Sequence, residues 1–296
     1  MNLLLVPMHK ITGQTDLQQM EEDVIAGIQT GAERMILDEI VAKTKQRMKE
    51  VQRDISLQEI KEKALALGSD TGYPFEKALR GEEIGFICEV KKASPSKGLI
   101  AADFPYVKIA KEYEQAGATA ISVLTEPYFF QGANDYLTQI RSQVSIPILR
   151  KDFTIDPYMI YEAKVIGADA ILLICAVLTD EELNAYYKLA DSLGLSVLVE
   201  AHDEEEVRRA IAIGARIIGV NNRNLKDFTV DINNSIRLRQ MIPEHVIFVS
   251  ESGMKDAADI QRLRENRTDA VLIGETFMRS PDKKKMLGIL RGVHAS

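Results

Sequence analysis

The sequence contains no tryptophan, only 6% aromatic residues and only two cysteines among 296 residues. Neither cysteine has a partner at metal-ligand spacing, and the four histidines are scattered without forming an H-x-x-H or similar pair. We therefore predict no metal site. Cys88 and Cys175 both lie in apolar runs, so we expect buried, reduced thiols.

The chain also lacks a basic run and a long apolar run. Its formal net charge is −7, and a nucleic-acid partner would need clustered lysine and arginine. A local group of cations can still bind a small anion inside an acidic protein. No window approaches the roughly 20 apolar residues of a membrane span. The apolar stretch 3–6 is too short for a signal-peptide core. We predict a cytoplasmic protein without membrane or nucleic-acid partners.

What the sequence does have is ample material for one large core. Hydrophobic residues make up 46% and charged residues 27%, a balance typical of an α/β enzyme. Residues 1–34 are weakly patterned and form an extension of unknown role, whose removal should leave activity largely intact. Residues 35–53 carry apolar side chains at helical spacing, and residues 54–84 hold a further helical segment with a turn at 72–74.

A rhythm of short apolar runs begins near residue 86. Helical patterns of about 10–15 residues separate these runs, as in repeated βα units. A Gly-Ala pair precedes three of them, at Gly117, Gly167 and Gly214, where a glycine suits a helix C-cap. The eight runs are 86–90, 120–124, 147–149, 170–174, 196–199, 217–220, 246–249 and 270–273.

This count predicts the fold class α/β, a single (β/α)8 TIM barrel with an N-terminal helical extension. The catalytic domain would span 35–296, including the preceding helices within 35–84. A barrel of about 250 residues fits this length. An open, doubly wound sheet is the structural alternative.

Charged and amide side chains follow the apolar runs. In a (β/α)8 barrel the carboxyl ends of all strands meet at one face, where active sites lie. Residues i and i+2 share a side of a strand, so Glu89 and Lys91 should both point into the mouth. The alternative is a structural ring of ion pairs inside the barrel. The side chains concerned are Glu89, Lys91, Lys151, Glu200, Asn221 and Arg223.

Small residues follow the seventh and eighth runs, at Ser252-Gly253 and Gly274-Glu275-Thr276. Loops at these two places commonly bind phosphate through backbone N–H groups. After the first run, residues 94–98 form a loop by composition, either a flexible flap carrying Lys97 or a plain solvated connection.

At these residues the sequence resembles the indole-3-glycerol-phosphate synthase family. The resemblance runs from about Met35 to the C-terminus, with the motifs in order, and the R-K-D-F and N-N-R-N-L segments are especially specific. Cys88 stands where a small alanine would be expected in this family. The matching segments are CEVKKASPSKG (88–98), LTEPYFFQG (124–132), PILRKDFTIDPYMIYEAKVIGADAILL (147–173), LVEAHDEEEV (198–207), IIGVNNRNLKDFTVD (217–231), VSESGM (249–254) and VLIGETFMR (271–279).

The resemblance implies a carboxy-lyase of tryptophan biosynthesis. Its reaction closes the ring of 1-(2-carboxyphenylamino)-1-deoxy-D-ribulose 5-phosphate with loss of carbon dioxide and water. It implies no cofactor and no metal, a small phosphorylated substrate as partner, and a monomer or a homodimer. Two rivals remain: another phosphate-binding barrel, such as a sugar-phosphate isomerase of the same pathway, and a catalytically idle phosphate-binding or scaffold protein.

The resemblance also implies residue roles. Lys151 is expected to protonate the sugar carbonyl, Glu200 to act as an acid–base group, and Lys91 to donate a proton in the dehydration; which lysine acts at which step stays open. Loss of Lys151 should leave stability unchanged or raised. Glu89, Asn221 and Arg223 would orient the catalytic groups and hold the sugar hydroxyls. The remaining expected substrate contacts are Ser94, Phe130, Phe153, Ser252, Gly253, Gly274 and Glu275, with Ser252 also counted as catalytic.

Overall fold

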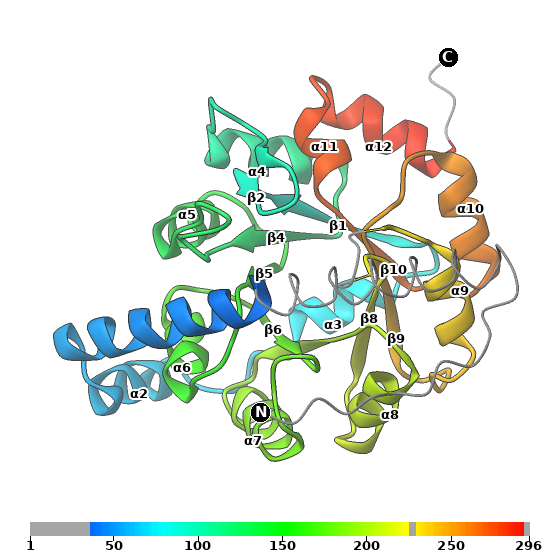
Figure 1. The fold of residues 1–296 in the computed structure, drawn as a ribbon. Helices are drawn as coiled ribbons and strands as arrows, with labels where there is room; N and C mark the ends of the chain where they lie inside the picture. The colour runs from blue at the N-terminus through cyan, green and yellow to red at the C-terminus, as the bar shows by residue number, and fades with distance from the viewer. Residues whose placement is uncertain (1–35, 225–228, 293–296) are drawn as a thin grey trace, which may run out of the picture.

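The computed structural model describes residues 36–224 and 229–292, and its strands close into a parallel barrel ringed by helices (Figure 1). Around the barrel the strand order is β1-β10-β9-β8-β7-β6-β5-β4. The predicted eight-stranded barrel is therefore confirmed, and the alternative prediction of an open, doubly wound sheet is wrong. The strands are β1 (Gly85–Val90), β4 (Ala120–Leu124), β5 (Ile148–Lys151), β6 (Ala170–Ile174), β7 (Ser196–Ala201), β8 (Ile217–Asn221), β9 (Ile247–Glu251) and β10 (Ala270–Ile273).

A helix follows each strand along the chain. Local signals fix several helix ends: Thr179 and Glu182 form a capping box, and Gly117 ends its helix at φ 90°, a left-handed value that glycine adopts without strain. The helices are α4 (Tyr106–Ala116), α5 (Asn134–Arg141), α6 (Pro157–Val165), α7 (Asp180–Ser192), α8 (Glu204–Ala212), α9 (Asn233–Arg239), α10 (Ala257–Glu265) and α12 (Lys283–Arg291).

Short elements are added at the strand ends. A small hairpin, β2 (Ala93–Ser94) with β3 (Gly98–Leu99), follows β1, and α11 (Glu275–Arg279) follows β10. The expected loop at 94–98 is thus the turn of a hairpin. Both additions lie at the carboxyl ends of their strands, the end at which the predicted site residues gather.

The opposite end of the barrel is closed by α3 (Pro74–Leu79). Phe75 and Leu79 are fully buried among interior side chains of the strands, including Ile87 and Leu149. Aromatic and aliphatic side chains therefore plug the bottom of the barrel, whereas charged residues occupy its mouth.

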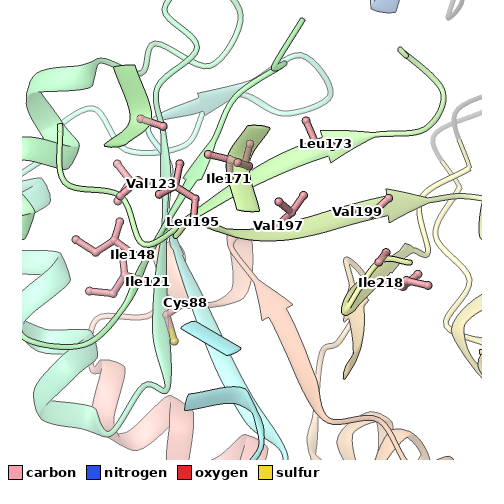
Figure 2. Close-up of a cluster of buried hydrophobic side chains, with 14 of the residues drawn as sticks. Cys88, Ile121, Val123, Ile148, Ile171, Leu173, Leu195, Val197, Val199 and Ile218 are labelled. Atoms are coloured by element: carbon pink, nitrogen blue, oxygen red, sulfur yellow. The ribbon is translucent and has the colours of Figure 1, made fainter. Parts of the chain in front are cut away.

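A second apolar layer lies between the strands and the surrounding helices. Figure 2 shows part of this layer, where Cys88 gathers with Ile121, Val123 and Ile148. Cys88 is 1% exposed, and burial raises the pKa of its thiol well above the ordinary value. Since β1 side chains alternate, Cys88 faces away from the mouth that Glu89 enters. A small apolar side chain suffices at this position, which explains why cysteine can stand there.

Two helices precede the barrel and pack on its side. One covers residues 36–54, and α2 (Leu57–Ala66) follows it and contacts α6 (Figure 1). Ile40 and Met48 are buried, as the apolar stripe predicted. Within residues 36–224 and 229–292, no helix combines the length and apolar character needed to span a membrane. The predictions for residues 1–34 lie outside the described residues.

Candidate active site

A cavity of about 1000 Å³ opens at the carboxyl ends of the strands. Every site residue predicted from the sequence lines it, although these residues come from segments far apart in the chain. They are Glu89, Lys91, Ser94, Phe130, Lys151, Phe153, Glu200, Asn221, Arg223, Ser252, Gly253, Gly274 and Glu275. The barrel therefore brings together one set of acids, cations, amides and aromatic rings.

Lys151 lies at the centre of this cavity between two carboxylates. Its Nζ donates at 2.8 Å to Glu200 Oε2 and at 2.8 Å to Glu251 Oε2. The side chains of the two glutamates are 7% and 2% exposed, so water screens these charges little. In the closed strand order β9 is opposite β5, and the Lys151–Glu251 ion pair thus spans the barrel.

The protonation behaviour of these groups follows from burial and pairing. Burial disfavours the Lys151 ammonium, but the charges of Glu200 and Glu251 outweigh this and raise its pKa above the usual value. Burial also opposes ionisation of Glu200, yet Lys151 and His202 hold its pKa well below normal. Glu251 differs, because burial and the nearby Glu200 charge raise its pKa. Glu251 is therefore the carboxylate of this cluster that takes up a proton first.

The interior is shaped to admit Glu251. A Cβ added at Gly219 would overlap Glu251 Oε1 and approach Leu198 Cδ1 to 3.0 Å. Glu251 Oε1 is buried and has no hydrogen-bond partner. An unpaired buried oxygen is costly when it carries charge. Its position favours a protonated or substrate-contacting carboxyl group.

Glu89 forms a separate pair. Glu89 Oε1 forms an ion pair with Lys91 Nζ and not with Lys151. Two positions apart on one strand end, these side chains point to the same side, as predicted. A Cβ on Gly274 would overlap Glu89 Oε1 and come within 3.0 Å of Lys91 Nζ. The glycine therefore makes room for this ion pair.

Polar groups from β7 and β8 hold Glu200 in place. Asn221 Nδ2 donates to Glu200 Oε1 at 3.3 Å, and Asn221 Oδ1 accepts from the backbone N–H of Arg223 at 3.1 Å. His202 Nε2 lies 3.2 Å from the same Glu200 Oε1 as an ion-pair contact without the angles of a hydrogen bond. Glu200 is thus contacted by Lys151, Asn221 and His202.

The loops after β9 and β10 offer backbone N–H groups. Ser252 and Gly253 both have left-handed backbones, with φ of 67° and 95°. The N–H of Ser252 donates to the backbone oxygen of Leu272 at 3.4 Å, and a non-glycine residue with a left-handed backbone is strained, as residues at functional sites often are. Gly274 is the N-cap residue of α11. Lys97 Nζ, on the hairpin after β1, lies 3.9 Å from Glu275 Oε2.

The opposite wall of the cavity is apolar. The rings of Phe130 and Phe153 lie 6.1 Å apart between centroids, tilted by 41°. Ile36, Leu37 and Ile40 of helix 36–54 also line the cavity. Together these side chains form an apolar surface on this side of the cavity.

Helix 36–54 is tied to this wall by a buried ion pair. Arg47 Nη2 lies 3.0 Å from both carboxylate oxygens of Asp152, the residue after Lys151. Asp152 also accepts from the Thr125 hydroxyl at 2.7 Å and lies 3.6 Å from Arg150. These cations hold the pKa of Asp152 low despite its burial. The helix is thereby fixed beside the end of β5.

Sequence reasoning missed four residues of the site: Arg47, Asp152, His202 and Glu251. For Glu251 a signal existed, since alternation from the buried Val249 puts it in the barrel interior. Asp152 stood in the quoted R-K-D-F motif. Arg47 gave no signal, because its partner is 105 positions away.

Comparison with known proteins agrees with this geometry. A family model described as indole-3-glycerol phosphate synthase matches residues 37–290. The chain is 59% identical over 258 residues to the indole-3-glycerol phosphate synthase of Ruminiclostridium cellulolyticum, covering 87% of this chain and 99% of that protein. It is 53% identical over 260 residues to that of Leuconostoc mesenteroides, with the same two shares covered.

Solved structures show the same fold at low identity. Thiamine phosphate pyrophosphorylase from Pyrococcus furiosus superposes with a TM-score of 0.55 at 16% identity, covering 73% of this chain and 96% of that one. KGPDC from Streptococcus mutans has a TM-score of 0.56 at 12% identity, with 72% and 97% covered. At these identities the likeness concerns the barrel alone.

Proposed function

The chain belongs to the indole-3-glycerol phosphate synthase family, and from that premise we propose that the charged cluster around Lys151 performs the family's ring closure. The enzyme is a decarboxylating carbon–carbon lyase of tryptophan biosynthesis, and it binds a phosphorylated small-molecule substrate. The isomerase and scaffold alternatives are therefore wrong.

The reaction requires groups that supply and remove protons in a dry site. The aromatic carbon bearing the carboxylate attacks the sugar carbonyl carbon of 1-(2-carboxyphenylamino)-1-deoxy-D-ribulose 5-phosphate. Carbon dioxide then leaves, the new hydroxyl takes up a proton and departs as water, and loss of a proton from C1 of the sugar forms the double bond of the new ring. Negative charge develops first on the carbonyl oxygen. A fixed ammonium near that oxygen stabilises it and can donate its proton.

Lys151 is the residue we assign to this first step. The observation that carries the assignment is its ammonium between Glu200 and Glu251 inside the cavity, with 2.8 Å contacts to each. The two carboxylates keep Lys151 charged despite burial, so that a proton is available. After donation, Glu251 can return one, because its raised pKa lets it hold a proton. We assign Glu200 the acid–base role and add Glu251 as a proton carrier, because its pKa is raised.

Lys91 is assigned to the loss of water. Its ammonium pairs with Glu89 beside Gly274, on the side of the cavity next to the phosphate loops. A proton from Lys91 would leave with the hydroxyl, and Glu89 would orient the lysine and hold sugar hydroxyls. Asn221 and Arg223 would position Glu200 and bind the sugar chain.

The two ends of the substrate are assigned to opposite walls. We place the phosphate at Ser252, Gly253, Gly274 and Glu275, where Glu275 would act through its N–H, with Ser94 as a further ligand. The carboxyphenyl ring would lie against Phe130 and Phe153. Because β9 is opposite β5 in the barrel, an extended substrate would cross the mouth over Lys151. We also propose that residues 35–296 act as one catalytic domain, in a cytoplasmic monomer.

The Lys151 assignment is tested by Lys151→Met, which keeps the apolar stem but removes the proton and the charge. Turnover should fall by at least roughly 10²–10⁴-fold, as for the loss of a general acid, whereas KM should change much less. The fluorescence of the indole product gives both values. Lys164→Met is the matched control, because this partly shielded lysine on α6 does not line the cavity. Near-normal turnover of Lys151→Met would remove Lys151 from the chemistry.

A further inference from the structure

His202 lies at the end of β7 between two carboxylates, and no step of the reaction has been assigned to it. Its Nδ1 lies 3.0 Å from Glu206 Oε2, and its Nε2 lies 3.2 Å from Glu200 Oε1. The ring is 11% exposed and lines the cavity, whereas Glu206 belongs to α8 behind it. The backbone N–H of His202 also donates to Glu206 Oε2 at 2.8 Å.

The two contacts define the charge of the ring. A neutral imidazole has one N–H and one lone pair, so one of its nitrogens would hold a lone pair within 3.2 Å of a carboxylate oxygen, which repels it. Both contacts are attractive only in the doubly protonated imidazolium. Burial opposes this charge, but Glu200 and Glu206 outweigh it and raise the pKa of His202 to about 10.

Among the described residues, the charges that dominate at the ring are the two carboxylates. On β5, Lys151 pairs with the other oxygen of Glu200, Oε2, and Glu251 of β9 pairs with Lys151. From α9, Asn234 donates to the backbone oxygen of His202 at 3.0 Å, and Arg237 pairs with Glu204 of α8. After β6, the Cys175 thiol contacts the Glu206 backbone oxygen at 3.6 Å.

We propose that His202 is a positioning residue for the ring closure: a permanent imidazolium that fixes Glu200 in place as an ionised carboxylate. Glu200 then contacts two cations, Lys151 and His202. Among the described residues Lys151 is the one cation that pairs with Glu251, and one oxygen of Glu251 has no hydrogen-bond partner. A proton entering the cluster therefore goes to Glu251. This inference rests on the proposed role of Glu200.

The charge of His202 can be observed without substrate. In NMR spectra of the full chain with ¹⁵N-labelled histidine, both ring nitrogens of His202 should be protonated at pH 8. An ordinary histidine, with a pKa of about 6.5, is neutral there. His202→Gln assigns the signal, and Glu206→Gln should lower the pKa of the ring. A neutral tautomer in the wild-type protein at pH 8 would overturn the proposal.

The effect on the Glu200–Glu251 pair is read from the pH profile of kcat/KM, which reports groups of the free enzyme, and the first proton that enters the pair sets its acid limb. His202→Gln keeps an N–H donor for Glu200 but removes the charge, so the acid limb should move up by about one pH unit or more. Glu206→Gln should move it in the same direction by less. A profile lowered in amplitude with an unmoved acid limb means that His202 is only structural.

These measurements separate the two hypotheses. If Glu200→Gln retained normal turnover, the proposed function of Glu200 would fail, although the NMR result for His202 would stand. If Glu200→Gln is inactive and His202→Gln leaves the acid limb unmoved, only the proposal for His202 fails.

Discussion

Among single residues, the charged side chains of the mouth are held by partners rather than by water. Lys91 pairs with Glu89, and Lys151 pairs with Glu200 and Glu251. Each ion would be expensive to bury alone, and pairing repays that cost only in good geometry. Removing one member of a pair therefore leaves its partner as an unpaired buried charge, which destabilises the fold.

Lys151→Met should therefore destabilise the fold, contrary to the expectation from sequence that stability would hold or rise. Two buried carboxylates would face each other unpaired, and breaking a buried pair costs about 3–5 kcal/mol. In the variant the folded state raises the carboxyl pKa above the unfolded value of about 4.3, so stability returns as pH falls. Thermal unfolding should show a deficit that is large at pH 8 and smaller at pH 5.5. A deficit independent of pH would contradict the role of the carboxylates.

Gly274 offers a second prediction at this scale. Gly274→Ala adds only a methyl group, but its Cβ would overlap Glu89 Oε1. Since Glu89 and Lys91 must shift, we expect kcat to fall about tenfold or more, in addition to any rise in KM. Steady-state kinetics of the variant measure both.

Gly81→Ala is the matched control, because its added Cβ would be 3.4 Å from the nearest atom, an ordinary contact. A change in KM alone for Gly274→Ala would mean that the glycine serves only phosphate binding.

Among the elements, helix 36–54 joins the mouth from outside the barrel. It contributes Ile36, Leu37 and Ile40 to the cavity wall. Its Arg47 Nη2 donates to both carboxylate oxygens of Asp152, each at 3.0 Å. Asp152 directly follows Lys151 in the chain. A shift of the helix would therefore move Asp152 and, with it, the backbone of Lys151.

Arg47→Met should consequently lower both stability and turnover. Hydrogen bonds to charged groups contribute about 1.5–3 kcal/mol, and among the described residues Asp152 then keeps Arg150 and Thr125 as its side-chain partners. Chemical denaturation and kinetics of the same preparation test this. Arg53→Met, on an exposed position of the same helix, should change neither. Equal behaviour of the two variants would show that the Arg47–Asp152 pair is dispensable.

On the scale of the whole molecule, the residues that stabilise the barrel interior and the residues of the candidate active site lie at opposite ends of the barrel. Its lower end is filled by the apolar side chains of α3, and its mouth by charge. Glu76 of α3 also pairs with Arg216, just before β8, at 2.9 Å, which fastens the plug to the barrel. A defect at the bottom should thus leave the site intact.

Phe75→Ala tests this separation. The side chain is fully buried, and removing a core phenylalanine costs about 3–5 kcal/mol through lost burial and the cavity left behind. At a temperature where the variant is folded, kcat should stay within about twofold of wild type. Leu67→Ala, at a position 59% exposed, is the control for both measurements. A large loss of kcat would mean that the plug shapes the mouth.

The sequence by itself determined the barrel and the residues that line its mouth. Apolar runs at a regular spacing specify βα units locally, and the alternation of side chains along a strand assigns Glu89 and Lys91 to the interior without any tertiary information. The family motifs added Lys151 and Glu200 to the residues predicted to line the mouth. Residues 1–34 carried no such pattern.

Only the tertiary structure decided which charges meet. The Lys151–Glu251 pair spans 100 positions and the Arg47–Asp152 pair 105, and no local preference encodes a contact across the barrel. The same holds for Gly219 and Gly274, whose missing side chains make room for carboxylates from other strands. Pairing is set by closure of the barrel, because closure fixes which strand ends are opposite. Protonation follows from pairing, and the chemistry of the mouth therefore emerges only in the folded chain.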